Sequence, residues 1–263
     1  MKNLIGVMQG RLLPKYKGRY QAFPKHTWQE EFKIASDFGL DCIEFIFDYE
    51  DYEKNPLIKN PKLILEISKK YQVSVFTVCA DYFMESKLTD SYDVLKQLVD
   101  NCSLIGVTDI VLPIIEKFSL RGCDKKKYVN ILQNISDYNK SINFSLETDL
   151  PPKEFASLLS DISRENVTVN YDIGNSASLG YDYKEELKTY GNKISDVHIK
   201  DRVFGGGPVV LGTGSADISG VIDMLTSMNY NGPYIMQSYR DDDIKTFTKQ
   251  LKWIHENCFN NIG

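Results

Sequence analysis

One stretch of the chain decides the fold: VTVNYDIGNSASLGYDYKEELKTYGNKISDVHIKDR, residues 167–202. Its two ends are rich in β-branched residues, which predicts strands at Val167–Asp172 and Ile194–Lys200. Between them, Tyr183–Tyr190 reads as a helix. A strand, a helix and a second strand in this order form a parallel pair joined by a crossover connection. The stretch therefore predicts an α/β fold with a parallel sheet.

The same unit repeats along the chain. Six further strands are predicted at Ile5–Met8, Cys42–Phe45, Val73–Cys79, Asp109–Leu112, Asn143–Glu147 and Tyr234–Gln237. Thr27 can cap a helix that Gly39 ends, and other helices are predicted at Pro61–Tyr71, Ser91–Leu104, Asp124–Lys140, Pro152–Ile162, Asp217–Met228 and Ile244–His255. After the first strand comes QGRLLP, residues 9–14, and not the G-x-G-x-x-G turn of a doubly wound sheet. We predict one domain over residues 1–263, a (β/α)₈ TIM barrel.

The composition is that of an ordinary globular protein, with 42% hydrophobic and 25% charged residues and a net charge of -5. This acidic balance argues against a nucleic-acid partner. The five cysteines are widely spaced and include no C-x-x-C pair, which predicts reduced thiols. We read neither a signal peptide nor an apolar run of the ~20 residues that a membrane span needs. We expect a cytoplasmic protein without a membrane partner; apolar helix residues would support a homodimer, but no segment requires one.

Polar residues gather where the fifth to eighth predicted strands end: Glu147, Asp172, His198 and Gln237. In a barrel, these ends lie side by side around one rim. Two carboxylates, an imidazole and an amide oxygen suit one divalent metal ion, either Mn²⁺, Mg²⁺, Co²⁺ or Zn²⁺. Each residue alone is explained better by a structural role: a helix cap or a salt bridge for the acids, and a hydrogen-bonded core histidine for His198. Together, on consecutive strands, they predict a metal site.

Several segments resemble the sugar phosphate isomerase/epimerase family of xylose-isomerase-like barrels: Leu146-Glu147, YDIGN at 171–175, VHIKDR at 197–202 and LGTG at 211–214. MQGRL at 8–12 and GLDCIE at 39–44 are also similar, so the resemblance covers essentially the whole chain. Each motif is weak alone, but their order and spacing are fairly specific. The resemblance implies a metal-dependent isomerase or epimerase of a small sugar or sugar phosphate that acts through an enediolate.

The resemblance also implies roles for single residues. Glu147, Asp172 and His198 match three metal ligands of the epimerase branch, with Glu147 as the base, and Arg202 matches an arginine that faces metal or substrate oxygens. The fourth ligand of that branch is a glutamate, and Gln237 stands in its place. An amide can hold a metal through its oxygen but cannot exchange a proton at ordinary pH. Either another acid replaces it, or a single base carries out aldose–ketose isomerisation, or catalysis has been lost.

Residues around the predicted rim are candidates for contact with the substrate. Three acids at or just past strand ends can replace the missing glutamate or bind sugar hydroxyls: Glu44, Asp81 and Glu116. Asn175 follows the sixth strand and joins this group. Further polar candidates are Gln9, Arg11, Lys200, Arg202 and Arg240. The basic residues can bind a phosphate or can simply neutralise the acidic metal ligands, and the sequence favours neither reading.

Three other functions compete with an isomerase. A sugar-acid or inosose-type dehydratase would use similar residues, with Lys200 as an acid. A DNA-repair endonuclease of this superfamily is disfavoured, because its several metal ions would need more than the three histidines present. A non-catalytic sugar-binding barrel stays open because of Gln237.

Overall fold

The computed structural model describes residues 3–259, and residues 1, 2 and 260–263 of the predicted domain lie outside this range. Within it, eight parallel strands close a barrel in the order β1-β10-β7-β6-β5-β4-β3-β2. These strands are β1 (Ile5–Met8), β2 (Cys42–Ile46), β3 (Thr77–Cys79), β4 (Asp109–Ile114), β5 (Asn143–Thr148), β6 (Val167–Asp172), β7 (Ile194–Ile199) and β10 (Tyr234–Met236). The predicted (β/α)₈ barrel is confirmed.

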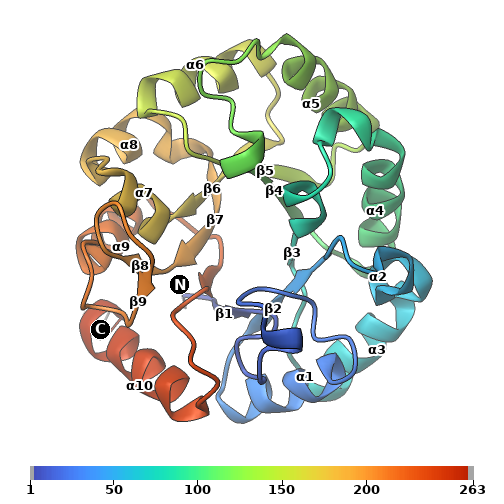
Figure 1. Ribbon diagram of the computed structural model, residues 1–263, viewed down its shortest axis with the longest axis vertical. Coiled ribbons are helices and arrows are strands. Elements are labelled where there is room, and N and C mark those ends of the chain that lie inside the picture. Colours follow the sequence, from blue (N-terminus) through green and yellow to red (C-terminus); the bar gives the residue numbers. More distant parts are fainter. Residues whose placement is uncertain (1–2, 260–263) are drawn as a thin grey trace.

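Helices surround the strands in a ring, as the view along the barrel shows (Figure 1). The helices that follow successive barrel strands are α1 (Trp28–Asp37), α3 (Pro61–Tyr71), α4 (Tyr92–Ile105), α5 (Lys126–Tyr138), α6 (Pro152–Ile162), α8 (Tyr183–Tyr190), α9 (Ile218–Ser227) and α10 (Ile244–Ile254). Each turns an apolar stripe toward the barrel; on α3, for example, Ile64 and Ile67 are buried. None of the helices within residues 3–259 combines the length and apolar character that crossing a bilayer requires.

Several elements were not predicted. They are α2 (Pro56–Lys59), α7 (Ile173–Leu179) and a small antiparallel hairpin of β8 (Asp201–Arg202) and β9 (Pro208–Val209), together with short 3₁₀ turns at Tyr16–Gly18, Tyr52–Lys54, Asp81–Met84, Leu88–Asp90, Glu116–Phe118 and Gly191–Lys193 and a π turn at His255–Phe259. All are shorter than the windows in which hydrophobic periodicity can be read.

The predicted helix cap at Thr27 is wrong. The side chain of Thr27 makes no cap hydrogen bond, although Gly39, with a φ of 70°, does follow the end of the helix. Threonine is a good capping residue, so the sequence alone cannot exclude it. The helix predicted from Asp124 begins two residues later, at Lys126, whose backbone N–H donates to Asp124 Oδ1 at 3.0 Å.

A buried carboxylate holds the loop after β1 in place and gives a pH-dependent stability. Glu31 accepts backbone hydrogen bonds from Gly10 at 2.7 Å and Leu12 at 3.0 Å, and burial raises its pKa to about 7. The folded state then keeps a proton at pH values where the unfolded chain has released it. The contribution of this protonated group to the free energy of unfolding is fully present below the ordinary carboxyl pKa and is lost as pH rises through about 7.

We expect Glu31→Gln to flatten the fall in unfolding free energy between pH 5 and pH 7.5 by an amount on the order of 3 kcal/mol. Urea unfolding at both pH values measures it. Glu66→Gln, a change on the outer surface of α3, is the matched control. An unchanged slope in Glu31→Gln would contradict the buried-carboxylate explanation.

Candidate active site

The site begins with the alternation of side chains along three neighbouring strands. Successive residues of a strand point to opposite faces, so Glu147 on β5, Asp172 on β6 and His198 on β7 all point into the barrel near its carboxyl end. Asp172 and His198 are paired in register. The three residues are buried, and each offers a ligand atom within 4.8 Å of the others. The structure thus brings the predicted metal-binding trio together.

The orientation of His198 fits a metal ligand. Its Nε2 lies 2.8 Å from Glu44 Oε1; when Glu44 is ionised, its carboxylate can only accept, and this places the imidazole proton on Nε2. Nδ1 is then a lone-pair donor. Within the described residues it has no hydrogen-bond partner although it is buried, and it lies 4.0 Å from Asp172 Oδ2. A histidine whose second nitrogen is held by a carboxylate is the usual arrangement at metal sites.

Glu44 therefore lies behind His198 and not in contact with open space, where a substrate-binding role had been expected. It is fully buried, and burial raises its pKa to about 7. Asp196 lies two residues before His198 on β7. It is also fully buried, and its Oδ2 lies 3.9 Å from His198 Nε2. Burial and then the charge of Glu44 raise the pKa of Asp196 well above its ordinary value. Together Glu44, Asp196 and His198 form a second acidic grouping beneath the first.

Glu147 is oriented by a short chain of hydrogen bonds. Asn175 Nδ2 donates to Glu147 Oε1 at 2.6 Å, and Arg202 Nη1 donates to Asn175 Oδ1 at 2.7 Å. Arg202 Nε donates to the Gly206 carbonyl at 2.9 Å, which ties the chain to the β8–β9 hairpin. Burial, followed by the charge of Asp172, raises the pKa of Glu147 to about 7. A cation bound beside it would lower that pKa again.

Lys200 and Gln237 complete the rim. Lys200 Nζ donates to Gln237 Oε1 at 2.9 Å and to Asp172 Oδ2 at 3.2 Å. Gln237 Nε2 donates to Gln21 Oε1 at 3.1 Å. The amide oxygen that would face a metal is thus an acceptor for an ammonium group.

A cavity of about 240 Å³ opens above these residues at the carboxyl end of the barrel. Seven residues that the sequence identified line it: Asp81, Glu116, Glu147, Asn175, Lys200, Arg202 and Gln237. Sequence reasoning missed the others, namely Arg19, Gln21, Asp48, Met84, Glu85, Pro113 and Ile115. Asp48 and Ile115 each come just after a barrel strand, which was a usable signal; Arg19 and Gln21 lie in a long loop that carries no pattern.

Gln9, Arg11 and Arg240, which were expected to contact substrate, do not line this cavity. Gln9 Oε1 accepts a hydrogen bond from the Ile46 backbone N–H at 3.0 Å. Arg11 donates to the Tyr20 carbonyl at 3.0 Å, and Arg240 donates to the same carbonyl at 3.3 Å. All three are buried, and the two arginines hold the loop after β1 against the barrel.

Glu116 has a strained backbone at the edge of the cavity. Its φ is 51°, in the left-handed region that residues other than glycine, asparagine and aspartate rarely adopt. Strain of this kind costs on the order of 1–3 kcal/mol and is concentrated at functional sites. The same left-handed φ occurs at Lys17, Gln72 and Ser163, which do not line the cavity, so the role of Glu116 rests on its place in the lining.

Two glycines of the resembling motifs have a structural explanation. A Cβ on Gly174 would lie 2.8 Å from Lys200 Cγ, so YDIGN needs glycine there for α7 to pack on the strand-seven segment. A Cβ on Gly214 would collide with the Asp201 carboxylate. These two motif glycines therefore let their loops pack close to the site.

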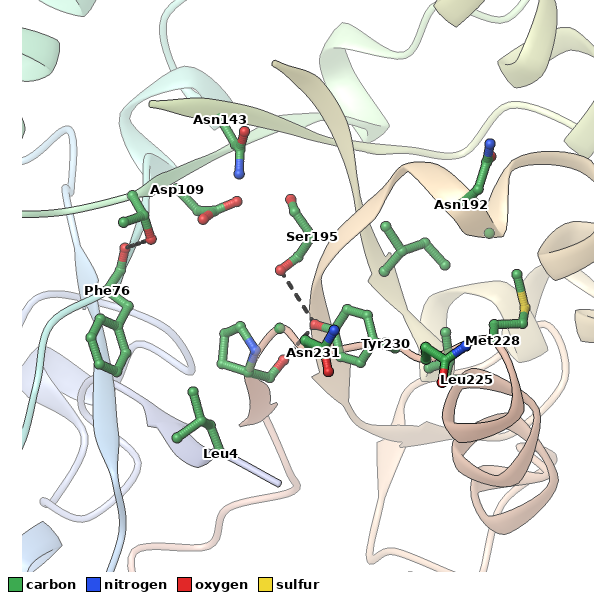
Figure 2. A pocket seen from close by; sticks show the side chains of 16 residues that line it. Leu4, Phe76, Asp109, Asn143, Asn192, Ser195, Leu225, Met228, Tyr230 and Asn231 are labelled. Carbon is green, nitrogen blue, oxygen red and sulfur yellow. Dashed lines mark hydrogen bonds between the residues drawn. The ribbon is translucent and has the colours of Figure 1, made fainter. Parts of the chain in front are cut away.

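A larger cavity of about 490 Å³ lies at the opposite end of the barrel (Figure 2). Asp109, Asn143 and Ser195, which line it, stand at the amino ends of their strands. Active sites of these barrels are built at the carboxyl end, and the amino end serves stability. We therefore assign the smaller cavity as the candidate active site.

Comparison with known proteins agrees with this architecture. A protein of Haemophilus influenzae named "Putative L-ribulose-5-phosphate 3-epimerase" is 21% identical, over 92% of this chain and 96% of its own. The structure of a Methylomonas sp. D-allulose 3-epimerase in complex with D-allulose superposes with a TM-score of 0.71 at 16% identity, covering 97% of each chain. The IolI protein, solved with a zinc atom, gives 0.72 at 15% identity, covering 97% of this chain and 99% of its own.

At such identities, the two solved structures establish a shared fold. The family is established by a different comparison: the model described as "Xylose isomerase-like TIM barrel" matches residues 32–257. This match spans most of the chain and includes Glu44, Glu147, Asp172, His198 and Gln237. The chain belongs to the xylose isomerase-like TIM barrel family.

Proposed function

We propose that this protein is a metal-dependent epimerase or isomerase of a small sugar or sugar phosphate. One observation carries the proposal: the buried Nδ1 of His198, which has no hydrogen-bond partner among residues 3–259, is grouped with the carboxylates of Asp172 and Glu147, and Glu147 also lines the polar cavity. Support comes from the family, from the name of the Haemophilus influenzae relative and from the sugar bound to the Methylomonas neighbour.

Glu147, Asp172 and His198 would hold one divalent ion, with the Gln237 oxygen as a fourth ligand if Lys200 moves away. Two oxygen donors and one nitrogen donor suit Mn²⁺, Mg²⁺, Co²⁺ or Zn²⁺, and the neighbour that carries zinc supports this choice. When bound, the ion would polarise the substrate carbonyl and stabilise the negative charge that develops on its oxygen.

The chain's own residues would move the proton. Glu147 takes the proton from the carbon next to the carbonyl, so that the C–H bond breaks, a carboxyl O–H bond forms and the electron pair moves into an enediolate. Return of this proton to the neighbouring carbon from the same face, together with transfer of the hydroxyl proton between the two oxygens of the enediolate, completes an aldose–ketose isomerisation. Epimerisation needs a donor on the opposite face. Gln237 cannot provide one, whereas Asp81 and Glu116 line the same cavity.

The test is hydrogen–deuterium exchange at carbons next to the carbonyl of pentuloses, hexuloses and their phosphate esters, followed by proton NMR in D₂O. We expect exchange that needs Mn²⁺, Co²⁺ or Zn²⁺ and that stops when EDTA removes the metal. A new stereoisomer or an aldose then identifies the reaction.

One observation favours a second reading, a sugar-binding barrel without catalysis. Lys200 places an ammonium group between Asp172 and Gln237, where it can neutralise the site in place of a metal. Sugar binding without exchange of any C–H proton, in a protein that takes up no metal, would select this reading. A dehydrated 2-keto product would select the dehydratase.

We also propose that the protein acts in the cytoplasm. All five cysteines are free thiols, as expected in a reducing compartment.

A further inference from the structure

The loops after the last two barrel strands are where barrels of this type often bind a phosphate group, through backbone N–H groups. In this chain, the loop after β7 already holds an anion. Asp201 is fully buried, and its carboxylate accepts hydrogen bonds from the backbone N–H groups of Gly212 at 2.9 Å, Gly214 at 2.8 Å and Ala216 at 3.1 Å. The Asp201 carboxylate thus occupies the backbone N–H groups that a phosphate bound to this loop would need.

The helices that follow β7 and β10 also begin with an aspartate that accepts backbone hydrogen bonds. Asp217 caps α9 by accepting from the Gly220 N–H at 3.0 Å, and Asp243 caps α10 by accepting from the Lys245 N–H at 2.9 Å. Asp241 and Asp242 precede the second cap. Aspartate at a helix start satisfies the exposed N–H groups and repels a second anion. Both helix starts are thus unfavourable to phosphate.

The basic side chains at the cavity are also engaged. Arg19 makes a two-pronged ion pair with Asp48, at 2.8 and 3.0 Å. Lys200 is bound to Asp172 and Gln237, and Arg202 donates to Asn175 and to a hairpin carbonyl, as described above. Arg11 and Arg240 do not line the cavity; Arg11 Nη2 donates to Gln21 Oε1 at 2.9 Å, and Arg240 Nη2 donates to Asp242 Oδ1 at 3.1 Å. A phosphate entering the cavity would have to displace one of these partners.

The remaining lining is acidic. Glu147 would hold the metal ion and Asp48 is paired with Arg19, so the other carboxylates around the cavity are Asp81, Glu85 and Glu116, beside the basic Lys200 and Arg202. A phosphate ester carries a charge of about −1.5 to −2 and offers acceptor oxygens, which carboxylates repel. Sugar hydroxyls, in contrast, can donate to carboxylates.

We propose that the substrate is an unphosphorylated polyhydroxy sugar whose hydroxyl groups donate to Asp81 and Glu116. This inference rests on the proposed function and separates two substrate classes that the function leaves open. It also separates this chain from the phosphate-ester activity in the name of its Haemophilus influenzae relative.

The experiment measures binding, so that it does not depend on turnover. Calorimetry compares L-ribulose with L-ribulose 5-phosphate, and D-fructose with D-fructose 6-phosphate, on the wild-type protein with and without Mn²⁺. We expect the free sugar of the better-bound pair to bind at least tenfold more tightly than its ester, and inorganic phosphate not to displace it. An ester that binds as tightly as the free sugar, or displacement by phosphate, overturns the inference.

A charge reversal provides the second arm. Glu116→Lys should raise the affinity for the phosphate ester at least fivefold relative to the free sugar, whereas Glu66→Lys, the same change on the exposed face of α3, should not. Equal effects of the two variants would mean that Glu116 does not face the substrate, and would overturn its assigned role. The proposed function is tested separately, by exchange of the substrate C–H proton. If no exchange is found, the comparison of binding affinities can still be made.

Discussion

Replacing Glu147 with glutamine should slow exchange of the substrate C–H proton by about 10²- to 10⁴-fold, the usual contribution of a positioned general base. Glutamine keeps the size of the side chain and can still accept from Asn175 Nδ2, which lies 2.6 Å from Glu147 Oε1. It cannot take a proton. The measurement is the initial rate of deuterium incorporation at saturating substrate and saturating Mn²⁺, with bound metal determined in the same sample.

The control is Glu116→Gln, the same chemical change on the lining of the same cavity. We expect it to change KM more than kcat, because Glu116 would contact a hydroxyl and would not act on the reacting carbon. If metal-loaded Glu147→Gln keeps a rate within about threefold of wild type, Glu147 is not the base and Asp81 becomes the next candidate.

Most of the barrel could be predicted because its elements follow simple periodicities. All eight predicted barrel strands exist, and β6 and the helix Pro152–Ile162 match residue for residue. β3 is shorter than predicted: Val73–Cys79 is reduced to Thr77–Cys79, with one isolated bridge at Ser74. A β-branched run shows where a strand can form, but pairing with neighbours on both sides decides where it does.

The site was only partly predictable, for a physical reason. Strand alternation fixes the direction of Glu147, Asp172 and His198, so their convergence followed from the fold. Alternation does not say how deep in the barrel a side chain lies. For this reason the sequence could not predict that Glu44 lies beneath His198 and not in the cavity. Long side chains are harder still: Arg11 and Arg240 begin near the rim, yet their guanidinium groups bind the Tyr20 carbonyl. The carbonyls of a loop without sequence pattern cannot be located in advance.

The metal site makes the second large prediction. His198→Ala should weaken Mn²⁺ or Zn²⁺ binding by at least about 100-fold, because it removes the nitrogen ligand and leaves two carboxylates. Glu44→Gln should have a smaller effect, about 10- to 100-fold, because it changes the group that holds the Nε2–H without touching the ligand atom. Competition with a fluorescent chelator measures both affinities, and circular dichroism checks the fold of the metal-free variants.

His26→Ala and His255→Ala are the matched controls, since neither residue lines the cavity or belongs to the metal-binding group, and both variants should bind metal as wild type does. The order of effects carries the argument. If Glu44 orients His198, ¹⁵N NMR of metal-free wild type should report an imidazole protonated at Nε2, and this preference should weaken in Glu44→Gln. If His198→Ala loses the metal but Glu44→Gln keeps the same tautomer, His198 is a metal ligand and Glu44 does not orient it. Equal metal affinity in wild type and His198→Ala would show that the cation is not bound by Nδ1. The base role of Glu147, which depends on its being close to that cation, would then lose its support.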